Sequence, residues 1–232
     1  MALLGMLAAA IMAHQSAAPV FMLGMDGRIQ MGRRTFEAEL MPGATQKRIA
    51  KGMAYDFIGQ RGGILLGDPA PLQLTGSMTI SSWVYLRSYA PNGAQGEIFF
   101  RGDDRNGLDP YCLVVEADGT VNFAICNEKG EGAGVKAEIS LNRWTHVLAS
   151  LDARTGEMSM WLDGEKVAYT RTSKRPFAAL LTQFAAGVGV GNVQNNHGPH
   201  NQPLNGMIAD LRVYSSVLTP QDVDWSAPGS VR

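Results

Sequence analysis

Residues 142–166, NRWTHVLASLDARTGEMSMWLDGEK, constrain the fold of this chain more than any other stretch does. Trp144, His146 and Leu148 share one face and the residues between them share the other, which is the period of a pleated strand. An Asp-Ala-Arg-Thr-Gly segment then predicts a turn, a second alternating segment predicts another strand, and its final Asp-Gly pair is a strong signal for a tight hairpin. The stretch therefore predicts an antiparallel meander and excludes a helix.

Similar short alternating segments follow one another along most of the 232 residues, separated by turn signals every eight to twelve residues or so. This spacing favours a sandwich of antiparallel sheets over an alternating α/β fold. A sandwich of this length can form a single domain with a sizeable core. We therefore predict an all-β, antiparallel β-sandwich domain over residues 19–232. Near its end, Thr219 and Pro220 have the character of a helix cap and first helical position, which predicts one short C-terminal helical turn.

Two further motifs accompany the meander. The segment 78–84, MTISSWV, predicts a strand, and the segment 206–214, GMIADLRVY, predicts a closing strand before the terminal turn. Together with the Trp-x-His and Asp-Gly motifs, and in this order, they resemble the laminin-G-like branch of the concanavalin-A-like jelly rolls. The resemblance covers residues 52–223. It implies a jelly-roll topology and a role as an extracellular recognition module.

The first eighteen residues, MALLGMLAAAIMAHQSAA, have the outline of a secretory signal peptide, with a short apolar run and a small-residue end. The apolar run is too short to span a bilayer, and no other stretch is long enough to do so. We therefore predict a signal peptide over residues 1–18, no membrane insertion, and a secreted, periplasmic or cell-surface location. The alternative is an apolar N-terminal segment that packs on the domain.

Cys112 and Cys126 flank a predicted hairpin whose turn is Ala-Asp-Gly at residues 117–119. This register places the large apolar residues of both strands on one face and both cysteines on the other. The two thiols would be opposite or diagonal, so a disulfide depends on a shift of one pair position. The sequence leaves a disulfide and two buried free thiols as equal alternatives.

Charge and motifs argue against several classes of function. The net charge is −1 and there is no basic cluster, so we predict no nucleic-acid partner. A retaining glycosidase needs two carboxylates about 5–5.5 Å apart, and the nearest pattern, Glu116-Ala-Asp118, runs into a Gly-Thr turn. There is also no nucleophile elbow, zinc-binding helix motif or phosphate-binding loop. We therefore predict a non-catalytic protein, with a jelly-roll glycoside hydrolase or polysaccharide lyase as an alternative.

Aromatic residues in the predicted strands admit two interpretations. Trp83, Trp144 and Trp161 lie among residues patterned for a core, so we interpret them as packing residues rather than platforms for stacking sugars. His146 lies on the same strand face as Trp144, and we interpret it as a packed structural histidine rather than a catalytic base.

The loop at residues 102–110 is rich in side-chain oxygen, which suits a hard cation such as calcium. In calcium-binding laminin-G-like modules, an Asp just ahead of an aromatic-led strand contributes a ligand together with a group from a late loop. The resemblance therefore implies Asp109 as a ligand, with Asn195, Asn196 or Asn201 supplying the late-loop group. Asp103 and Asp104 are further candidates nearby. The alternative is a turn-forming loop without a metal.

The late loop, residues 191–206, GNVQNNHGPHNQPLNG, is the most polar long loop of the chain. Its side chains offer both hydrogen-bond donors and acceptors, a mixture that suits sugar hydroxyls or a polar protein surface. Long loops of this kind in compact domains are usually either functional or disordered. The candidate ligand contacts are Asn195, Asn196, His197, His200, Asn201 and Gln202.

These observations favour a module that binds glycans or glycosylated surface partners through its rim loops, with calcium as a candidate cofactor. A structural or protein–protein adhesion domain is the main alternative, and it would require a contiguous exposed apolar patch. Because fold does not settle function, the choice between these alternatives depends on the site.

Overall fold

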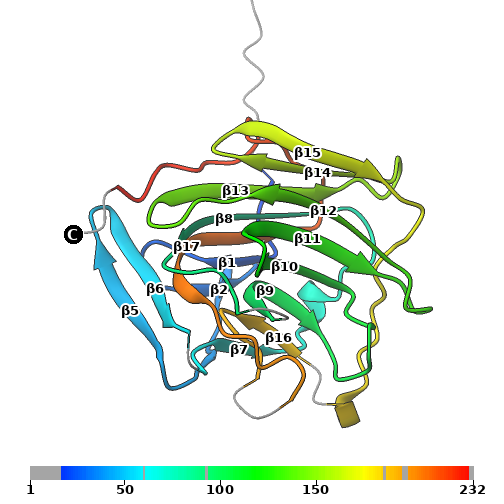
Figure 1. Ribbon diagram of the computed structural model, residues 1–232, viewed down its shortest axis with the longest axis horizontal. Helices are drawn as coiled ribbons and strands as arrows, with labels where there is room; N and C mark the ends of the chain where they lie inside the picture. The colour runs from blue at the N-terminus through cyan, green and yellow to red at the C-terminus, as the bar shows by residue number, and fades with distance from the viewer. Residues whose placement is uncertain (1–16, 60, 92–93, 185–186, 195–197, 230–232) are drawn as a thin grey trace, which may run out of the picture.

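The computed structural model describes residues 17–59, 61–91, 94–184, 187–194 and 198–229. Almost all of the predicted signal peptide, residues 1–16, therefore lies outside the described residues. Two antiparallel sheets pack face to face into a sandwich consistent with the predicted jelly roll (Figure 1). No helix among the described residues is long and apolar enough to cross a membrane.

The larger sheet contains ten strands within the described residues. Its order is β15-β14-β13-β8-β17-β1-β2-β3, and the hairpin β5–β6 joins it through pairing of β6 with β17. Figure 1 shows this hairpin at the side of the sandwich. The strands are β1 (Phe21–Leu23), β2 (Ile29–Met31), β3 (Arg34–Thr35), β5 (Ala44–Ile49), β6 (Gly52–Ile58), β8 (Met78–Leu86), β13 (Trp144–Leu151), β14 (Glu157–Leu162), β15 (Glu165–Arg171) and β17 (Asn205–Tyr214).

The smaller sheet contains seven strands within the described residues, in the order β12-β11-β10-β9-β16-β7-β4. They are β4 (Glu39–Leu40), β7 (Ile64–Gly67), β9 (Gln95–Gly102), β10 (Tyr111–Glu116), β11 (Thr120–Cys126), β12 (Gly132–Glu138) and β16 (Gly187–Val190). Two 3₁₀ helices, η1 (Ala70–Leu72) and η2 (Thr182–Phe184), lie in the connections.

The predicted meander is confirmed as the run β13-β14-β15, and β13 also pairs with β8 along eight residues. The two faces of β13 have different surroundings. Val147, Ala149 and Leu151 are fully buried in the core between the sheets. Trp144 and His146 lie on the opposite, outer face of the ten-stranded sheet, which is important for the cleft described below.

The cysteine hairpin also has the predicted register. Leu113 pairs with Phe123 and Val115 with Val121, and all four side chains are buried in the main core. Cys112 pairs with Ala124 on the other face, which places Cys126 diagonally, two residues further along β11. Both cysteines are buried free thiols.

Two segments differ from expectation. Residues 28–51 are polar and have no sustained alternation, a pattern that predicts a long loop with one short strand at residues 36–40. They contain four strands instead, β2 to β5, which are held by pairing with β1, β6 and β7. Near the C-terminus, the predicted helical turn is a single hydrogen-bonded turn. Asp222 N donates to Thr219 O at 3.0 Å, and Thr219 Oγ1 donates to Asp222 Oδ2 at 2.7 Å. The chain does not continue into a helix but crosses toward the outer face of the larger sheet.

A buried arginine fixes the connection that precedes β16. Arg101, at the end of β9, is fully buried and its guanidinium forms two hydrogen bonds with the Asp68 carboxylate, at 2.8 and 3.1 Å. It also donates to the backbone carbonyl of Phe177 at 3.1 Å. Because a buried charge requires a partner and satisfied donors, this network holds residues near Phe177 against the end of β9, next to the loop of predicted metal ligands.

Candidate functional site

The late loop is closed at its base by one buried side chain. The Oδ1 of Asn192 accepts hydrogen bonds from the backbone amides of Val193 and Gln202, both at 3.0 Å. Its Nδ2 donates to Asn201 Oδ1 at 3.0 Å. Asn192 is completely buried, so its amide joins the start and the end of the loop. Asn195, Asn196 and His197 lie outside the described residues, and the first two candidate contacts that can be placed are His200 and Asn201.

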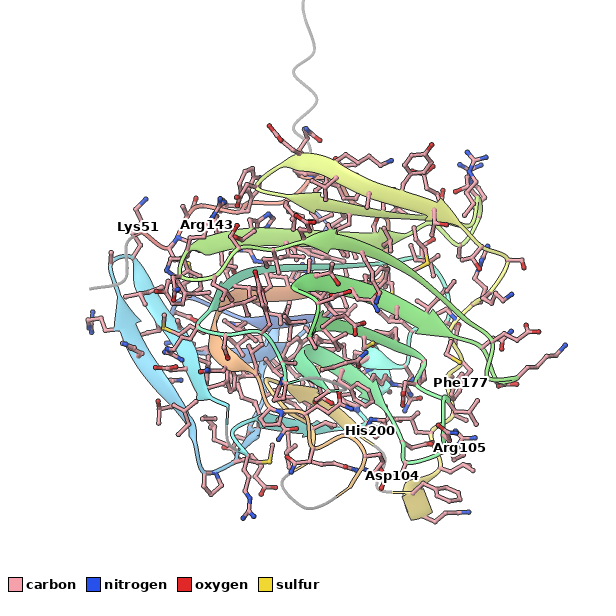
Figure 2. The ribbon with its side chains drawn as sticks, in the orientation of Figure 1. Lys51, Asp104, Arg105, Arg143, Phe177 and His200 are labelled. Carbon is pink, nitrogen blue, oxygen red and sulfur yellow. The ribbon has the colours of Figure 1, made fainter. Side chains whose placement is uncertain are left out.

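His200 is turned into the molecule. Its Nε2 donates to the backbone carbonyl of Asp103 at 3.0 Å, and its ring lies 4.6 Å from the ring of Phe100. Its backbone amide donates to Gln194 Oε1 at 3.1 Å. Only 12% of the His200 side chain is exposed. His200, which was predicted to contact a ligand, therefore connects the late loop to the loop at residues 102–110. Figure 2 shows His200 and Asp104 at the same end of the molecule.

Gln202 and Asn201 have different surroundings. Gln202 Nε2 donates to the carbonyl of Pro199 at 2.9 Å, and its Oε1 is buried without a hydrogen-bond partner in the protein. Its backbone carbonyl accepts from Glu97 N at 3.0 Å. Asn201, in contrast, lines an open cavity. Of the candidate contacts that can be placed, Asn201 is therefore the best positioned to meet a ligand.

Two of the three carboxylates predicted to bind calcium, those of Asp103 and Asp104, already accept hydrogen bonds within the protein. Asp103 is buried and accepts hydrogen bonds from the Arg105 guanidinium at 2.7–3.0 Å and from Leu181 N at 2.9 Å. Burial acts to raise the pKa of Asp103, but the bonds from Arg105 and Leu181 outweigh it and lower the pKa. Asp104 Oδ1 accepts from Gln194 Nε2 at 2.5 Å.

Asp109 differs from the other two carboxylates. Its Oδ1 is buried without a hydrogen-bond partner among the described residues, and His200 Nε2 is 3.5 Å away. Burial raises the pKa of Asp109 to about 6, opposed by His200 and reinforced by the charges of Asp103 and Asp104.

A calcium ion requires several free oxygen ligands, whereas the Arg105 cation already neutralises Asp103. No group of three or more His, Cys, Asp or Glu side chains within the described ranges is arranged to hold a metal. The described His, Cys, Asp and Glu side chains therefore do not by themselves form a calcium site. The prediction that includes Asn195 stays a prediction, because that residue lies outside the described residues.

A buried acid that was not predicted from the sequence lies beneath the late loop. Glu97, on the outer face of β9, is 1% exposed, and neither of its carboxyl oxygens has a hydrogen-bond partner. The nearby Val193 N–H instead donates to Asn192 Oδ1, at 3.0 Å. Burial raises the pKa of Glu97 well above its ordinary value, an effect that Val193 opposes and Asp109 reinforces. An isolated Glu in an apolar strand was the only signal in the sequence, and it does not indicate which side of the sheet is covered.

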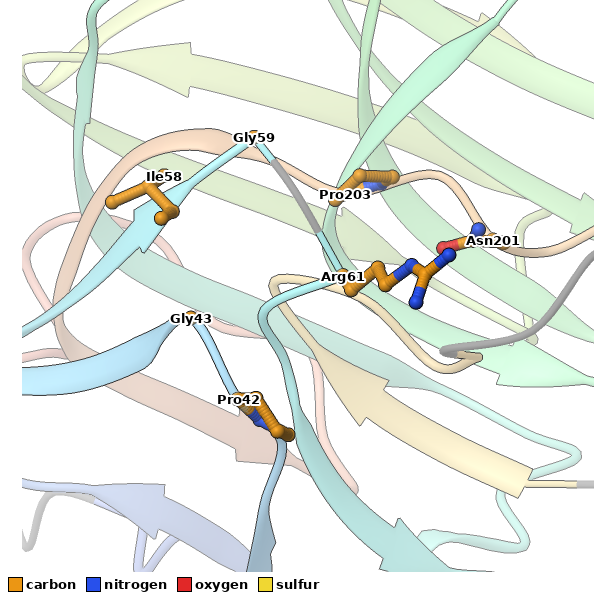
Figure 3. Close-up of a pocket in the computed structure, with 7 residues that line it drawn as sticks. All are labelled: Pro42, Gly43, Ile58, Gly59, Arg61, Asn201 and Pro203. Atoms are coloured by element: carbon orange, nitrogen blue, oxygen red, sulfur yellow. The ribbon is translucent and has the colours of Figure 1, made fainter.

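The cavity at this end of the sandwich, here called the rim cavity, has a volume of about 980 Å³ (Figure 3). It is formed by three segments: the turn after β4, the end of β6 with the residues that follow it, and the late loop. The lining residues are Pro42, Gly43, Ile58, Gly59, Arg61, Asn201 and Pro203. Figure 3 shows the Arg61 side chain pointing toward Asn201. The cavity therefore combines a cation, an amide and small apolar surfaces.

The local backbone explains how these loops approach one another. Gly59 has φ 72° and its N–H donates to Leu204 O at 2.9 Å, which ties the end of β6 to the late loop. A Cβ at Gly59 would lie 3.1 Å from the Cβ of Asn205. Arg61 has φ 58°, a left-handed conformation that is unfavourable for a residue with a side chain. Such strain is often retained at binding sites.

A family model described as the concanavalin A-like lectin/glucanases superfamily matches residues 59–224. No curated protein sequence matches the chain.

Many solved structures are similar in fold. The binding domain of Paraclostridial Mosquitocidal Protein 1 superposes with a TM-score of 0.67 at 11% identity, covering 88% of this chain and 50% of that chain. The binding domain of botulinum neurotoxin DC in complex with SialylT superposes with a TM-score of 0.64 at 11% identity, covering 90% and 50%. This chain thus spans about half the length of these toxin domains.

A third similar structure matches over nearly its whole length. It is domain 4 of a GH43 extracellular arabinanase from Geobacillus stearothermophilus, in complex with arabinotriose. The TM-score is 0.67 at 20% identity, and the match covers 90% of this chain and 97% of that chain. At these identities the structural comparisons establish a shared fold, and the ligands named are those of the neighbours.

Proposed function

Because the chain belongs to the concanavalin A-like lectin/glucanase superfamily, we propose that it is a non-catalytic module that recognises glycans through the rim cavity. The observation that carries this proposal is the convergence of Arg61 and Asn201 on one open cavity of about 980 Å³. Pockets that hold small polar ligands combine apolar walls with a few placed polar groups, and this cavity has that composition. Two structural neighbours bound to SialylT and arabinotriose support a glycan as the ligand class.

The charge of the rim cavity indicates which glycans suit it. Arg61 is exposed and has no ion-pair or hydrogen-bond partner among the described residues, and no acidic residue lines the cavity. A guanidinium offers paired donors that match a carboxylate or sulfate. The proposal therefore favours a glycan that carries a carboxylate or sulfate group.

The buried acids beneath the loop support the non-catalytic part of the proposal. Glu97 and Asp109 have raised pKa values, a common property of catalytic acids. However, Glu97 is 1% exposed, and neither acid lines the rim cavity. A general acid has to come within hydrogen-bond reach of the bond it protonates, and the late loop covers Glu97.

Export is part of the same proposal, since a glycan ligand of this kind is met outside the cell. It is supported by the signal-peptide outline of residues 1–18. N-terminal sequencing of protein recovered from the medium or periplasm of an expressing bacterium would show whether this segment is removed.

Glycan-array binding of the purified protein tests the proposed function. We expect wild-type protein to bind glycans with a carboxylate or sulfate, and Arg61→Ala to lose about tenfold or more in affinity with the loss of a charge-assisted hydrogen bond. Asn201→Ala should weaken the binding of the same glycans. Arg154→Ala is the matched control, because Arg154 is 85% exposed and follows β13 at the end remote from Asn205.

A parallel arm with calcium and with a chelator tests the cofactor. We expect equal binding in both arms, because the described carboxylates do not form a ligand set for calcium. Binding lost in the chelator would establish calcium dependence, with Asp109→Ala as the next variant. If folded wild-type protein binds a glycan and Arg61→Ala and Arg154→Ala reduce this binding equally, the rim cavity is not the binding site.

A further inference from the structure

A second cavity lies on the outer face of the ten-stranded sheet, away from the rim cavity. It has a volume of about 640 Å³, and its walls are the side chains of Trp83, Tyr85, Trp144 and Trp225. None of its lining residues lines the rim cavity. We call it the aromatic cleft. In Figure 2, Arg143 at this cleft is well separated from His200 beside the late loop.

The alternation of two paired strands places three of these aromatic rings. Trp83 and Tyr85 are two residues apart on β8 and point to the same face. Trp144 is directly opposite Tyr85 in the register of β13 with β8, and their rings meet edge to face with centroids 5.7 Å apart. The strands therefore provide a fixed aromatic surface that requires no loop ordering when a ligand binds.

The fourth ring is contributed by the C-terminal segment. Trp225 lies 6.0 Å from Trp83 and 4.8 Å from His146, measured between ring centroids, and is nearly parallel to His146. Its Nε1 donates to the carbonyl of Pro220 at 3.1 Å, so Trp225 is tied to the turn that begins its own segment. Ala227, Pro228 and Gly229 continue the segment along the cleft.

Two indole N–H groups at the cleft have no partner. The Nε1 atoms of Trp83 and Trp144 are buried and form no hydrogen bond with the described residues, and Trp83 as a whole is only 6% exposed. Buried donors are nearly always paired, and an unpaired one calls for an explanation. An indole N–H can only donate. Because neither nitrogen is accessible to solvent, a ligand in the cleft would contact the exposed surfaces of the rings and not these N–H groups.

The polar edge of the cleft comes from two turns whose backbones are strained. Asn142 has φ 59° and Asp163 has φ 51°, both left-handed conformations. They account for two of the four non-glycine residues with positive φ in the described part of the chain, and both line this cleft. The Asn142 amide provides two donors and an acceptor. A strained backbone at a cavity edge is a common feature of binding sites.

The charges at this edge cancel. Arg143 forms an ion pair with Asp163, and the other Asp163 oxygen accepts from the backbone amide of His146 at 2.8 Å. Arg143 and Asp163 are the only charged residues among those that line the cleft. The cleft thus offers aromatic faces and an amide without an uncompensated charge, which distinguishes it from the rim cavity with Arg61.

We propose that the aromatic cleft is a separate binding site for a neutral sugar. The apolar C–H face of a sugar ring packs on the aromatic walls, as apolar surfaces do on aromatic side chains. The sugar hydroxyls pair with the Asn142 amide at the edge of the cleft. This site does not depend on the glycan proposed for the rim cavity.

Intrinsic fluorescence reports on this site directly. The chain has four tryptophans, Trp83, Trp144, Trp161 and Trp225, and three of them line the cleft. The experiment is a titration of the full chain with arabinotriose, maltotriose and cellotriose, each to about 10 mM, which would reveal a Kd of about 1 mM or tighter. We expect at least one of these neutral trisaccharides to change the emission saturably and to protect it from acrylamide.

The variants identify the cleft as the source of the signal. Trp144→Ala should weaken binding by about tenfold or more, because it removes a stacking surface. Asn142→Gly, which keeps the left-handed backbone without strain, should weaken it by about threefold to tenfold. Trp161→Phe is the matched control, since Trp161 packs beside Leu148 and Tyr214 outside the cleft. Arg61→Ala separates this site from the rim cavity and should leave the Kd unchanged.

Three outcomes would overturn the proposal. The first is a flat titration with all three trisaccharides. The second is a response that Trp161→Phe weakens as much as Trp144→Ala and Asn142→Gly do. The third is a response abolished by Arg61→Ala, which would assign the sugar to the rim cavity. Far-ultraviolet circular dichroism shows whether each variant is folded. If Trp144→Ala does not fold, the affinity of Asn142→Gly decides whether the cleft is the binding site.

Discussion

The rim cavity draws its lining from three loops, whereas the aromatic cleft is built on two paired strands and the C-terminal segment. The loops present a cation and an amide, whose geometry depends on buried anchors such as Asn192. The strands present rings whose positions follow from the register of β8 with β13. Within one fold, loops therefore provide polar selectivity and a sheet face provides a rigid apolar surface. The two regions should respond differently to the same kinds of change.

The largest expected effect comes from removing the anchor of the late loop. Asn192→Ala would leave the amides of Val193 and Gln202 without their acceptor, at a cost of about 3 kcal/mol in the free energy of unfolding. Chemical denaturation measures this loss. Glycan binding at the rim cavity should be lost as well, whereas the fluorescence response of the aromatic cleft to sugar should not change.

Asn205→Ala is the control for this variant, because its Nδ2 donates to Ser88 Oγ at 2.9 Å near the surface. We expect it to cost about 0.5 kcal/mol. If Asn192→Ala cost no more than Asn205→Ala, the late loop would not be held by this amide.

Acidification should affect the two regions with opposite sign. Burial, with the charge of Arg212, lowers the pKa of His146 to about 4, below its unfolded value of 6.5. Between these values the unfolded state binds more protons, so stability is lost as the pH falls from 6.5 to 4, by about 3 kcal/mol. His146→Gln should remove this dependence.

The raised pKa of Asp109 has the opposite effect on how stability changes with pH. Its pKa is about 6 in the folded protein, above the unfolded value of 3.8, so the folded state binds more protons between these values. Stability is therefore gained as the pH falls from 6 to 3.8, by at most about 3 kcal/mol. The advantage of Asp109→Asn over wild type should be greatest near pH 8 and shrink toward pH 4. Urea denaturation at several pH values measures both effects, and parallel curves for wild type and either variant would contradict the corresponding assignment.

The smallest expected effect concerns backbone strain at the two sites. Arg61→Gly should raise the free energy of unfolding by about 0.5 kcal/mol, because a left-handed residue with a side chain costs more than glycine loses in chain entropy. Asn142→Gly should change it by less, since Asn tolerates this conformation better. Arg61→Gly should nevertheless bind the rim glycan poorly. A loss of stability in Arg61→Gly would show that the side chain makes a stabilising contact.

Much of the fold could be predicted from local pattern. The alternation of Leu113, Val115, Val121 and Phe123 around a turn placed all four in the core, as observed. The meander was predicted for the same reason. The short strands of residues 28–51 could not be predicted, because they are stabilised by pairing with β1, β6 and β7 rather than by their own sequence.

The sites were less predictable than the fold. Asn201 was predicted from loop composition and does line a cavity. His200 was predicted in the same way, but it is turned inward by the carbonyl of Asp103, a residue 97 positions away in the chain. Trp83 and Trp144 were interpreted as packing residues, and they do pack in a hydrophobic cluster. The cluster lies on the outer face of the larger sheet beside Trp225, and the sequence did not predict that placement.

The sequence by itself determined which residues share a strand face, where the chain turns, and the family to which it belongs, because these depend on neighbours within a few positions. Only the tertiary structure decided which face each sheet buries and which distant segments meet. Arg61 and Asn201 converge on one cavity, and Trp83, Trp144 and Trp225 on another. A strand pattern with a period of two is unchanged when its faces are exchanged, and only the packing of the second sheet distinguishes inside from outside.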